Sequence, residues 1–436
     1  MQQQEEGLKR AVGLWGFSAN MINIIVGAGI FVLPAIIAEG LGAAAILAYL
    51  YCGFLVITIA LCFAEVGSSV TQSGGSYSYI EVAFGKYAGF LATNLFVIGA
   101  CITADAAVAN ALADSLAYLL PIFKNQVVRS IFFLFLFSGL AWLNIRGVKE
   151  GIGMVKLTAI AKLTPLLLLL LLGWMHISVE NLAWTVNPTF KDLGAAALVL
   201  FFAFQGVETG MNIGGEVKSP QKTIPRGIFI SVLCILVLYI LIQITAQGIL
   251  GPSLPTFKEA PLAETAKHVF GAAGVTIIIV GAAISIFGML SGEILNIPRI
   301  IFRASFDDVI PPKALSRVHQ KYFTPYVAII AYATLDFLLA TIGEFKQLAI
   351  LSSASVLLIY LGVALSVIKL RVKKQTQPGA FRIPGGYLVP ILAILTVLWL
   401  LSSLSRNEQI GGLIFVGVLT AIYFGMGFFR KKKEGV

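Results

Sequence analysis

One short stretch decides how this chain folds: residues 22–35, INIIVGAGIFVLPA. It lies in an apolar run long enough to cross a bilayer, yet its centre, Gly27-Ala28-Gly29, is the weakest helix-forming part of that run. Glycine destabilises a helix interior by about 1 kcal/mol relative to alanine. In lipid, irregular backbone survives only where it is buried in protein or lines a cavity. Two interpretations follow: close helix packing through small residues, or an unwound segment whose free N–H groups face a ligand.

The composition defines the class of protein. Of the 436 residues, 58% are hydrophobic and only 12% are charged, which excludes an ordinary soluble domain. Apolar stretches of about 20 residues recur along the whole chain, and each can span a hydrocarbon core. Four cysteines without paired spacing and three widely separated histidines indicate neither a disulfide framework nor a metal site. We therefore expect an all-α integral membrane protein with no metal and no cofactor.

The apolar stretches predict twelve transmembrane helices. Their expected ranges are roughly 14–39, 42–67, 85–120, 127–145, 154–177, 192–217, 226–250, 272–303, 325–342, 347–369, 386–404 and 411–429. The connections between them carry Gly, Pro and charged residues, as in residues 217–227, VKSPQKTIPRG.

The positions of Lys and Arg predict the orientation in the membrane. Most of the 31 basic residues fall in connections on one side, if the twelve ranges are threaded alternately through the bilayer. Because basic loops stay in the cytoplasm, residues 1–13 and the basic tail 430–436 are both expected there. The net charge of +10 then reflects topology and contact with anionic membrane lipids, not nucleic-acid binding. The expected location is the inner (plasma) membrane of a prokaryotic cell.

A second interrupted segment occurs five spans after the first, at residues 204–208, FQGVE. Five spans reverse the direction of crossing, so the two interrupted helices run in opposite directions. Paired broken helices in inverted repeats are typical of transporters, with the binding site between the breaks. The sequence therefore predicts a first repeat at 14–177 and a second at 192–369. Helices 11 and 12, residues 386–429, fall outside the repeats.

Several motifs together resemble one known group. The segments GAGIFVLPA (27–35), AEVGSSVTQSGGSYSYIEVAFGKYAGF (64–90), LNIRGVKE (143–150) and FFAFQGVETGMNIGGEVKSPQKTIPRGI (201–228) are similar to motifs of the amino acid–polyamine–organocation superfamily. RIIFRASFDDVIP (299–311) and FRIPGGYLVP (381–390) also fit it. The resemblance covers nearly the whole chain. It implies a five-plus-five inverted repeat, the LeuT-like fold, with discontinuous helices 1 and 6 and secondary transport of amino acids or amines.

The resemblance implies a substrate site made largely of backbone. The N–H groups of Gly27, Ala28 and Gly29 are expected to hold the substrate carboxylate, since a helix start presents free donors and partial positive charge. Carbonyl groups near Ile24 and Phe202 are expected to take the α-amine. The alternative is that these glycines serve packing alone.

Residues at the second break are expected to complete this site. Family members carry an aromatic residue there that closes over the substrate, which points to Phe202, with Phe204 and Gly206 beside it. Ordinary packing is the alternative for both phenylalanines, because the chain has 30 of them.

Lys162 lies within an apolar span, in AIAKLTPLLLLLLLG. A buried lysine is unfavourable unless it finds a partner. In resembling proteins without sodium coupling, a lysine at this position replaces the sodium ion, which predicts sodium-independent transport here. Snorkelling of its ammonium group to the membrane surface is the alternative.

Four acidic residues also fall within predicted spans: Asp105, Glu208, Glu293 and Asp336. Ionisable residues in a membrane are functional candidates. Glu208 belongs to the family pattern of helix 6, so a shared structural or proton-handling role is expected for it. Counting along helices 3 and 8 places Asp105 and Glu293 at positions where members of the resembling family contact the substrate side chain, while Asp336 has no assigned role. The alternative for Asp105 and Glu293 is that they are protonated or paired within the protein.

The sequence as a whole predicts an amino acid transporter and not an enzyme. Proton coupling and exchange both remain open. Two carboxylates beside the side-chain pocket favour cationic amino acids, and a neutral substrate or an amino acid/polyamine exchange are the alternatives. A channel would need a continuous pore, often lined by rings of like residues, which a single asymmetric pair of breaks does not suggest.

Overall fold

The structure is a computed structural model that describes residues 12–69, 75–147, 152–210, 217–306, 312–373 and 381–433. Over these residues the chain is helical, and extended backbone pairs only at one isolated parallel bridge between Val12 and Val217. Residues 1–11 of the predicted N-terminal segment and 434–436 of the predicted tail lie outside the described residues.

The α-helices alternate with short 3-10 turns and one π-helical segment. The α-helices are Leu14–Ile25 (α1), Gly29–Leu41 (α2), Ile46–Ser69 (α3), Gly75–Phe84 (α4), Lys86–Asn94 (α5), Thr103–Leu119 (α6), Gln126–Ile145 (α7), Ile152–Gly173 (α8), Phe190–Leu200 (α9), Val207–Gly210 (α10), Pro220–Leu250 (α11), Pro261–Phe270 (α12), Ala272–Phe306 (α13), Tyr326–Ile342 (α14), Phe345–Val372 (α15), Leu388–Ser402 (α16) and Arg406–Lys433 (α17). The 3-10 segments are Gly42–Ala45 (η1), Pro121–Lys124 (η3), Trp174–His176 (η4), Val179–Leu182 (η5), Phe201–Phe204 (η6), Gly251–Thr256 (η8) and Lys313–Ser316 (η9). The π-helical segment is Leu95–Ile102 (η2).

These helices confirm the predicted class, an all-helical membrane protein. Eight segments within the described ranges are long and apolar enough to cross a membrane, and four shorter apolar helices accompany them. The structure also contains helices that the hydrophobic pattern did not predict, α4 and α12. Both are short and contain polar residues, so no long apolar run marked them.

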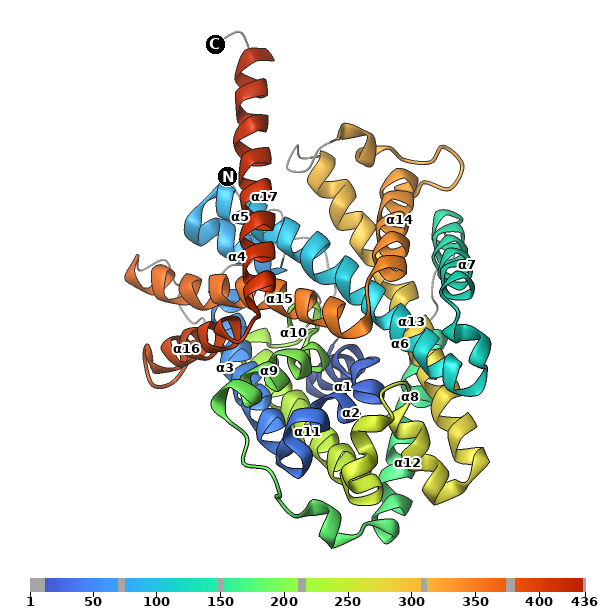
Figure 1. Cartoon of the computed structure of the whole chain (residues 1–436). Helices are drawn as coiled ribbons and strands as arrows, with labels where there is room; N and C mark the ends of the chain where they lie inside the picture. The colour runs from blue at the N-terminus through green and yellow to red at the C-terminus, as the bar shows by residue number, and fades with distance from the viewer. Residues whose placement is uncertain are drawn as a thin grey trace.

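Other helices surround α1 and α2 in the bundle (Figure 1). Helix α11 packs against α1 and α3, and α2 packs against α9. Helix α15 packs against α6, η2 and α3, and α14 packs against α7 and α13. The broken helix α1–α2 thus lies in the interior of the bundle.

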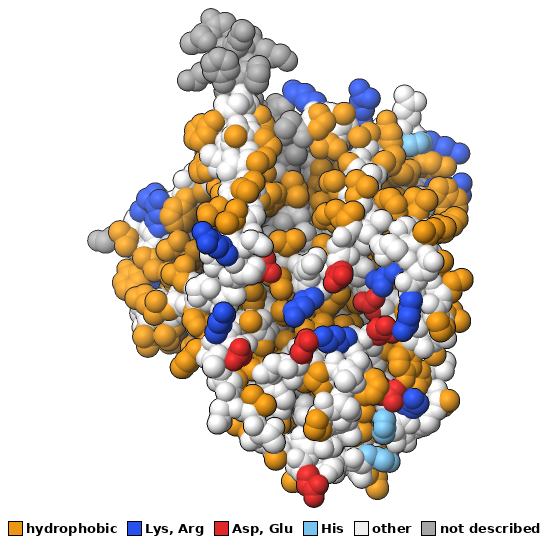
Figure 2. All heavy atoms as spheres, in the orientation of Figure 1, with side chains coloured by type: hydrophobic (Ala, Val, Ile, Leu, Met, Phe, Trp, Pro, Cys, Tyr) orange, Lys and Arg blue, Asp and Glu red, His pale blue; other side chains and the backbone are white. Residues whose placement is uncertain are grey.

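The surface of the bundle is suited to lipid. Large apolar side chains face outward on peripheral helices; Phe135 of α7 is 72% exposed and Leu413 of α17 is 74% exposed. On the face shown in Figure 2, acidic and basic side chains are intermixed near the middle, and hydrophobic side chains lie around them. Exposure of this much apolar surface is favourable in hydrocarbon and unfavourable in water.

A buried ion pair fixes the chain after α15. Arg371 donates through Nε and Nη2 to the two carboxylate oxygens of Glu65 on α3, both at 2.6 Å. Both side chains are at most 3% exposed. The backbone N–H of Ile383 donates to the same carboxylate at 2.7 Å, and Arg371 also reaches the carbonyl of Gly386 at 2.6 Å. The two-pronged geometry makes this the kind of pair in which arginine is not replaceable by lysine.

Candidate functional site

The first interrupted helix breaks where the glycines predict it. Helix α1 ends at Ile25 and α2 begins at Gly29. The cap position of α2 is Ala28, and no side chain caps this start. The first N–H groups of a helix have no partner within the helix, so those of α2 are free of side-chain competition. A donor-rich and partly positive helix start therefore lies in the protein interior.

The second interruption is longer and is also built around a glycine. Helix α9 gives way to the 3-10 turn η6, and α10 begins at Val207. Gly206 between them has φ +118°, a conformation that other residues rarely adopt. Its N–H donates to the carboxylate of Glu208 at 3.2 Å and 3.3 Å to the two oxygens. Tyr360 of α15 donates to the same carboxylate at 2.6 Å. Glu208 therefore holds the break to α15.

The two breaks touch each other. A Cβ atom at Gly29 would lie 3.1 Å from Cβ and 3.2 Å from Cα of Ala203. A Cβ atom at Gly206 would lie 2.9 Å from the Ile24 side chain. A Cβ atom at either glycine would therefore force Ala203 or the Ile24 side chain to move.

A tyrosine that sequence reasoning missed joins the breaks. The hydroxyl of Tyr239, on α11, lies 3.2 Å from the carbonyl oxygen of Ile25 and 3.1 Å from that of Ala203. Because a hydroxyl has one proton, it donates to one of these carbonyls at a time. Tyr239 is fully buried, and its ring packs edge-on against Phe204 with centroids 5.2 Å apart. The only signal in the sequence was a tyrosine within an apolar run, which needs a polar partner when buried.

The predicted aromatic residues occupy different surroundings. Phe204 is 1% exposed and packs against Tyr239, so it supports the second break through the contact of the two rings. Phe202 is 8% exposed and meets Phe345 edge-on, with centroids 5.7 Å apart. Next to them, the Gln205 side chain bonds Ser352 at 3.0 Å and Ser353 at 3.1 Å, both on α15.

Lys162 reaches the first break. Its side chain is buried, and its ammonium group donates to the backbone carbonyl of Asn23 on α1. This contact places the positive charge beside the C-terminal end of α1, where the partial negative charge of a helix lies. The side chain therefore does not snorkel to the surface in this structure.

Three acidic residues lie near one another on different helices. Asp105 on α6 and Asp336 on α14 are both 0% exposed, and Tyr332 of α14 donates to Asp105 at 2.9 Å. Glu293 on α13 is partly exposed and close enough to Asp105 for their charges to interact. It lies one turn from Met289, whose sulfur would be 3.5 Å from a Cβ atom at Gly27. Glu293 therefore lies on a helix that reaches the first break through Met289.

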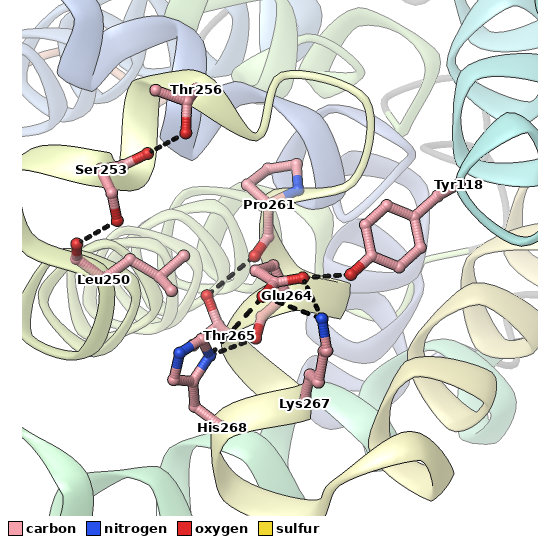
Figure 3. Close-up of polar contacts among 9 residues, drawn as sticks. All are labelled: Tyr118, Leu250, Ser253, Thr256, Pro261, Glu264, Thr265, Lys267 and His268. Carbon is pink, nitrogen blue, oxygen red and sulfur yellow. Dashed lines mark hydrogen bonds and ion pairs between the residues drawn. The ribbon is translucent and has the colours of Figure 1, made fainter.

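A cluster of polar side chains holds helix α12 in place (Figure 3). Glu264 of α12 is almost buried; it accepts a hydrogen bond from Tyr118 at the end of α6 and lies 3.3 Å from the ammonium of Lys267. His268 contacts the backbone carbonyl of Glu264 at 3.0 Å. Helix α12 also packs against α2, so this cluster joins the second half of the first broken helix to α6.

Two broken helices that meet inside a helical membrane protein are typical of secondary transporters. A family model described as amino acid permease matches residues 12–424. The chain belongs to this family, whose members are membrane transporters and not enzymes. The resemblance stated from the motifs is therefore confirmed.

Curated relatives match along almost the whole chain. The serine/threonine exchanger SteT of Bacillus subtilis is 29% identical, over 99% of this chain and 100% of the relative. The branched-chain amino acid permease BcaP of the same organism is 27% identical, over 96% and 93%. The human large neutral amino acids transporter small subunit 2 is 27% identical, over 95% and 79%.

Proposed function

We propose that this chain is a secondary transporter that binds an amino acid between its two broken helices and carries it across the membrane. The observation that supports this most directly is the contact between the breaks at Gly29 and Ala203, beside a helix start that no side chain caps. The free N–H groups of residues 27–29 suit a carboxylate. The C-terminal end of α1, with the carbonyl of Ile24, suits an α-ammonium group.

The packing of the helices supports an inverted repeat within this proposal. If 14–177 and 192–369 are the repeats, α3 corresponds to α11 and α7 to α14, and each of these pairs is in contact. The contact of α6 with α15 has its counterpart in the contact of α13 with α8. Packing that maps onto itself in this way fits a LeuT-like fold with twelve spans, in which 386–429 adds the last two.

We place both termini in the cytoplasm and the protein in the plasma membrane, on the distribution of Lys and Arg. A cleavable tag at either end tests this in sealed cells or inside-out vesicles. Cleavage of both tags only in inside-out vesicles agrees with the proposal, whereas cleavage of either in intact cells contradicts it.

Transport is proposed to be independent of sodium. The ammonium group of Lys162 provides a fixed positive charge at the end of α1, bound to the Asn23 carbonyl. A sodium ion at that point would meet this charge and compete for the same oxygen. Uptake measured in sodium and in potassium buffers tests this, and a requirement for sodium in the native protein would contradict it.

The side chain of the substrate has two candidates. A neutral amino acid is favoured because Asp105 is fully buried and already bonded to Tyr332, and because the relatives' names refer to serine, threonine, branched-chain or large neutral amino acids. A cationic amino acid is the second candidate, since Glu293 is partly exposed and near the first break. Buried charges can discriminate between such substrates by several kcal/mol.

Uptake by the purified protein in proteoliposomes tests the proposed function, with a panel of labelled amino acids. Gly27→Leu adds a large side chain at the first break on the side of α13, where the sulfur of Met289 lies 3.5 Å from the position of a Cβ atom. Gly139→Leu is the matched control, since a Cβ atom at Gly139 in α7 meets nothing within 4 Å. Loss of uptake in the first variant alone supports the site. Native affinity in Gly27→Leu would contradict it.

Competition assays with lysine, arginine, alanine and leucine decide between a neutral and a cationic substrate side chain. Competition by alanine or leucine alone supports the neutral candidate. If lysine and arginine compete instead, Glu293→Gln should weaken them more than it weakens any neutral competitor.

A further inference from the structure

Two aspartates lie in the interface between α6 and α14 without the partners that buried carboxylates need. Asp105 and Asp336 are both 0% exposed. One oxygen of Asp105 accepts a hydrogen bond from the hydroxyl of Tyr332 at 2.9 Å, and its other oxygen has no partner among the described residues. Within the part of the chain that the structure describes, neither oxygen of Asp336 has a hydrogen-bond partner. Buried polar groups are almost always hydrogen-bonded, so this pair calls for an additional ligand.

The described charged groups that act on the Asp336 carboxylate are acidic. Of the helices packed against α14, α6 contributes Asp105 and α13 contributes Glu293, both close enough for charge repulsion. The π segment η2 contributes Cys101, and α14 itself contributes Tyr332. These groups are neutral or acidic.

Basic side chains near this interface are engaged elsewhere or lie at its ends. Arg129, in the first turn of α7, binds Asp114 at 2.6 Å and Asn110 at 2.7 Å, further along α6. Arg146 follows the last residue of α7, and Lys313 is on η9, before α14 begins. Among the described residues the only buried basic side chains are Lys162 and Arg371, which contact Asn23 and Glu65.

Two carboxylates in this position cannot both be ionised at low cost. Their charges would repel in a medium of low dielectric constant, and each would have lost its hydration. A proton bound by one of the two carboxylates removes one charge and with it their mutual repulsion. We propose that Asp105 and Asp336 form a proton-binding site between α6 and α14, and that its loading and unloading is coupled to amino acid transport.

The pair is connected to both breaks, which gives a route for coupling. Glu293 lies within charge range of both aspartates and shares a face of α13 with Met289, next to Gly27. Helix α6 continues from η2, where the carbonyl of Ala100 accepts the Ser352 hydroxyl at 3.1 Å. That same hydroxyl lies 3.0 Å from the Gln205 side chain at the second break. A change of charge at the pair thus reaches the site through contacts on α13 and α15.

In this scheme a carboxylate oxygen gains an O–H bond when the pair faces one side of the membrane. It loses the proton to water when the pair faces the other side. The coupling rests on the proposed transport of amino acids, whereas the proton site itself does not. The two can therefore be tested separately.

The first experiment follows the protonated carboxyl group by infrared spectroscopy of the whole protein over a range of pH, without substrate. Asp336→Asn keeps the shape of a protonated aspartate, and Asp114→Asn removes a carboxylate from α6 that is already paired with Arg129. We expect the carboxylic acid band at neutral pH to be smaller in Asp336→Asn and unchanged in Asp114→Asn. A native band in Asp336→Asn at every pH would overturn the proton site, whatever the protein transports.

The second experiment measures transport in proteoliposomes with an imposed pH gradient, using the amino acids that the native protein takes up. We expect gradient-driven accumulation in native protein and in Asp114→Asn, and its loss in Asp336→Asn down to the level without a gradient. Exchange of internal for external amino acid, which moves no net proton, should continue in Asp336→Asn. The proposed coupling would be overturned if accumulation by the native protein did not depend on the pH gradient. It would also be overturned if gradient-driven accumulation persisted in Asp336→Asn. A native requirement for sodium that Asp336→Asn abolishes would assign the pair to a metal cation instead.

Discussion

Replacement of Tyr239 by phenylalanine removes a single oxygen atom from the point where the two broken helices meet. The hydroxyl serves the carbonyls of Ile25 and Ala203 at 3.2 Å and 3.1 Å, while the ring contact with Phe204 does not need it. The substitution leaves one more buried carbonyl group without a hydrogen-bond donor than the native protein has. The substitution therefore disturbs the geometry of the two breaks and leaves the packing of the ring against Phe204 unchanged.

The size of the effect can be worked from these contacts. Hydrogen bonds between membrane helices contribute about 0.6 kcal/mol on average and up to about 1.7 kcal/mol. A buried acceptor left without a donor costs about 1–3 kcal/mol. Because Tyr239 is fully buried, we expect a value of about 1–2 kcal/mol, which corresponds to about a 5- to 30-fold change in an equilibrium constant.

Binding of a labelled amino acid and thermal unfolding in detergent measure the two consequences. Tyr51→Phe is the matched control, because the Tyr51 hydroxyl donates to a single carbonyl, that of Thr396, at 3.0 Å and away from the breaks. We expect both variants to unfold at lower temperature and only Tyr239→Phe to bind substrate more weakly. Equal, native affinities in the two variants would refute the argument that Tyr239 sets the geometry of the site.

Three further outcomes are expected. Lys162→Met should reduce uptake at least about tenfold, because the loss of its bond to α1 is worth about 1.5–3 kcal/mol for a charged donor; native uptake in this variant would contradict the role. Gly29→Val should abolish substrate binding, since its Cβ would press on Ala203 at 3.1 Å and overpacking costs about 1–3 kcal/mol; binding assays decide this. Arg371→Leu should lower the free energy of unfolding by about 3–5 kcal/mol because it leaves Glu65 buried and unpaired. Additional replacement of Glu65 by Leu should recover much of that loss, and a further decrease of the same size would argue against the ion pair.

The sequence predicted those features that depend on local chemistry. Glycine is a poor helix former at any position, so the breaks at residues 26–28 and 205–206 could be located without knowledge of their neighbours. Apolar run length in the same way predicted an all-helical membrane protein. The short helix α12 was not predicted, because its ten residues are too few and too polar to form such a run.

The polar partners of the breaks could not be predicted, because they come from distant parts of the chain. Tyr239 and Tyr360 contact residues 36 and 152 positions away, and only the packed bundle brings them together. Asp105 shows a second limit. Its expected place beside the substrate came from counting along a regular helix, whereas the chain between Asn94 and Thr103 is π-helical. Its carboxylate is bonded to Tyr332, and its place beside the substrate stays a prediction.

The π-helical segment Leu95–Ile102 means that the position of Asp105 depends on the length of the chain before it as well as on the residues themselves. A π turn holds more residues than an α turn, and segments of this kind occur frequently at functional sites. Deletion of one residue there would favour a regular α-helix and change the rotation of α6 about its own axis. Asp105 would then face another neighbour without any change in its identity. A comparison of α6 among relatives must therefore count residues through this segment before it compares side chains.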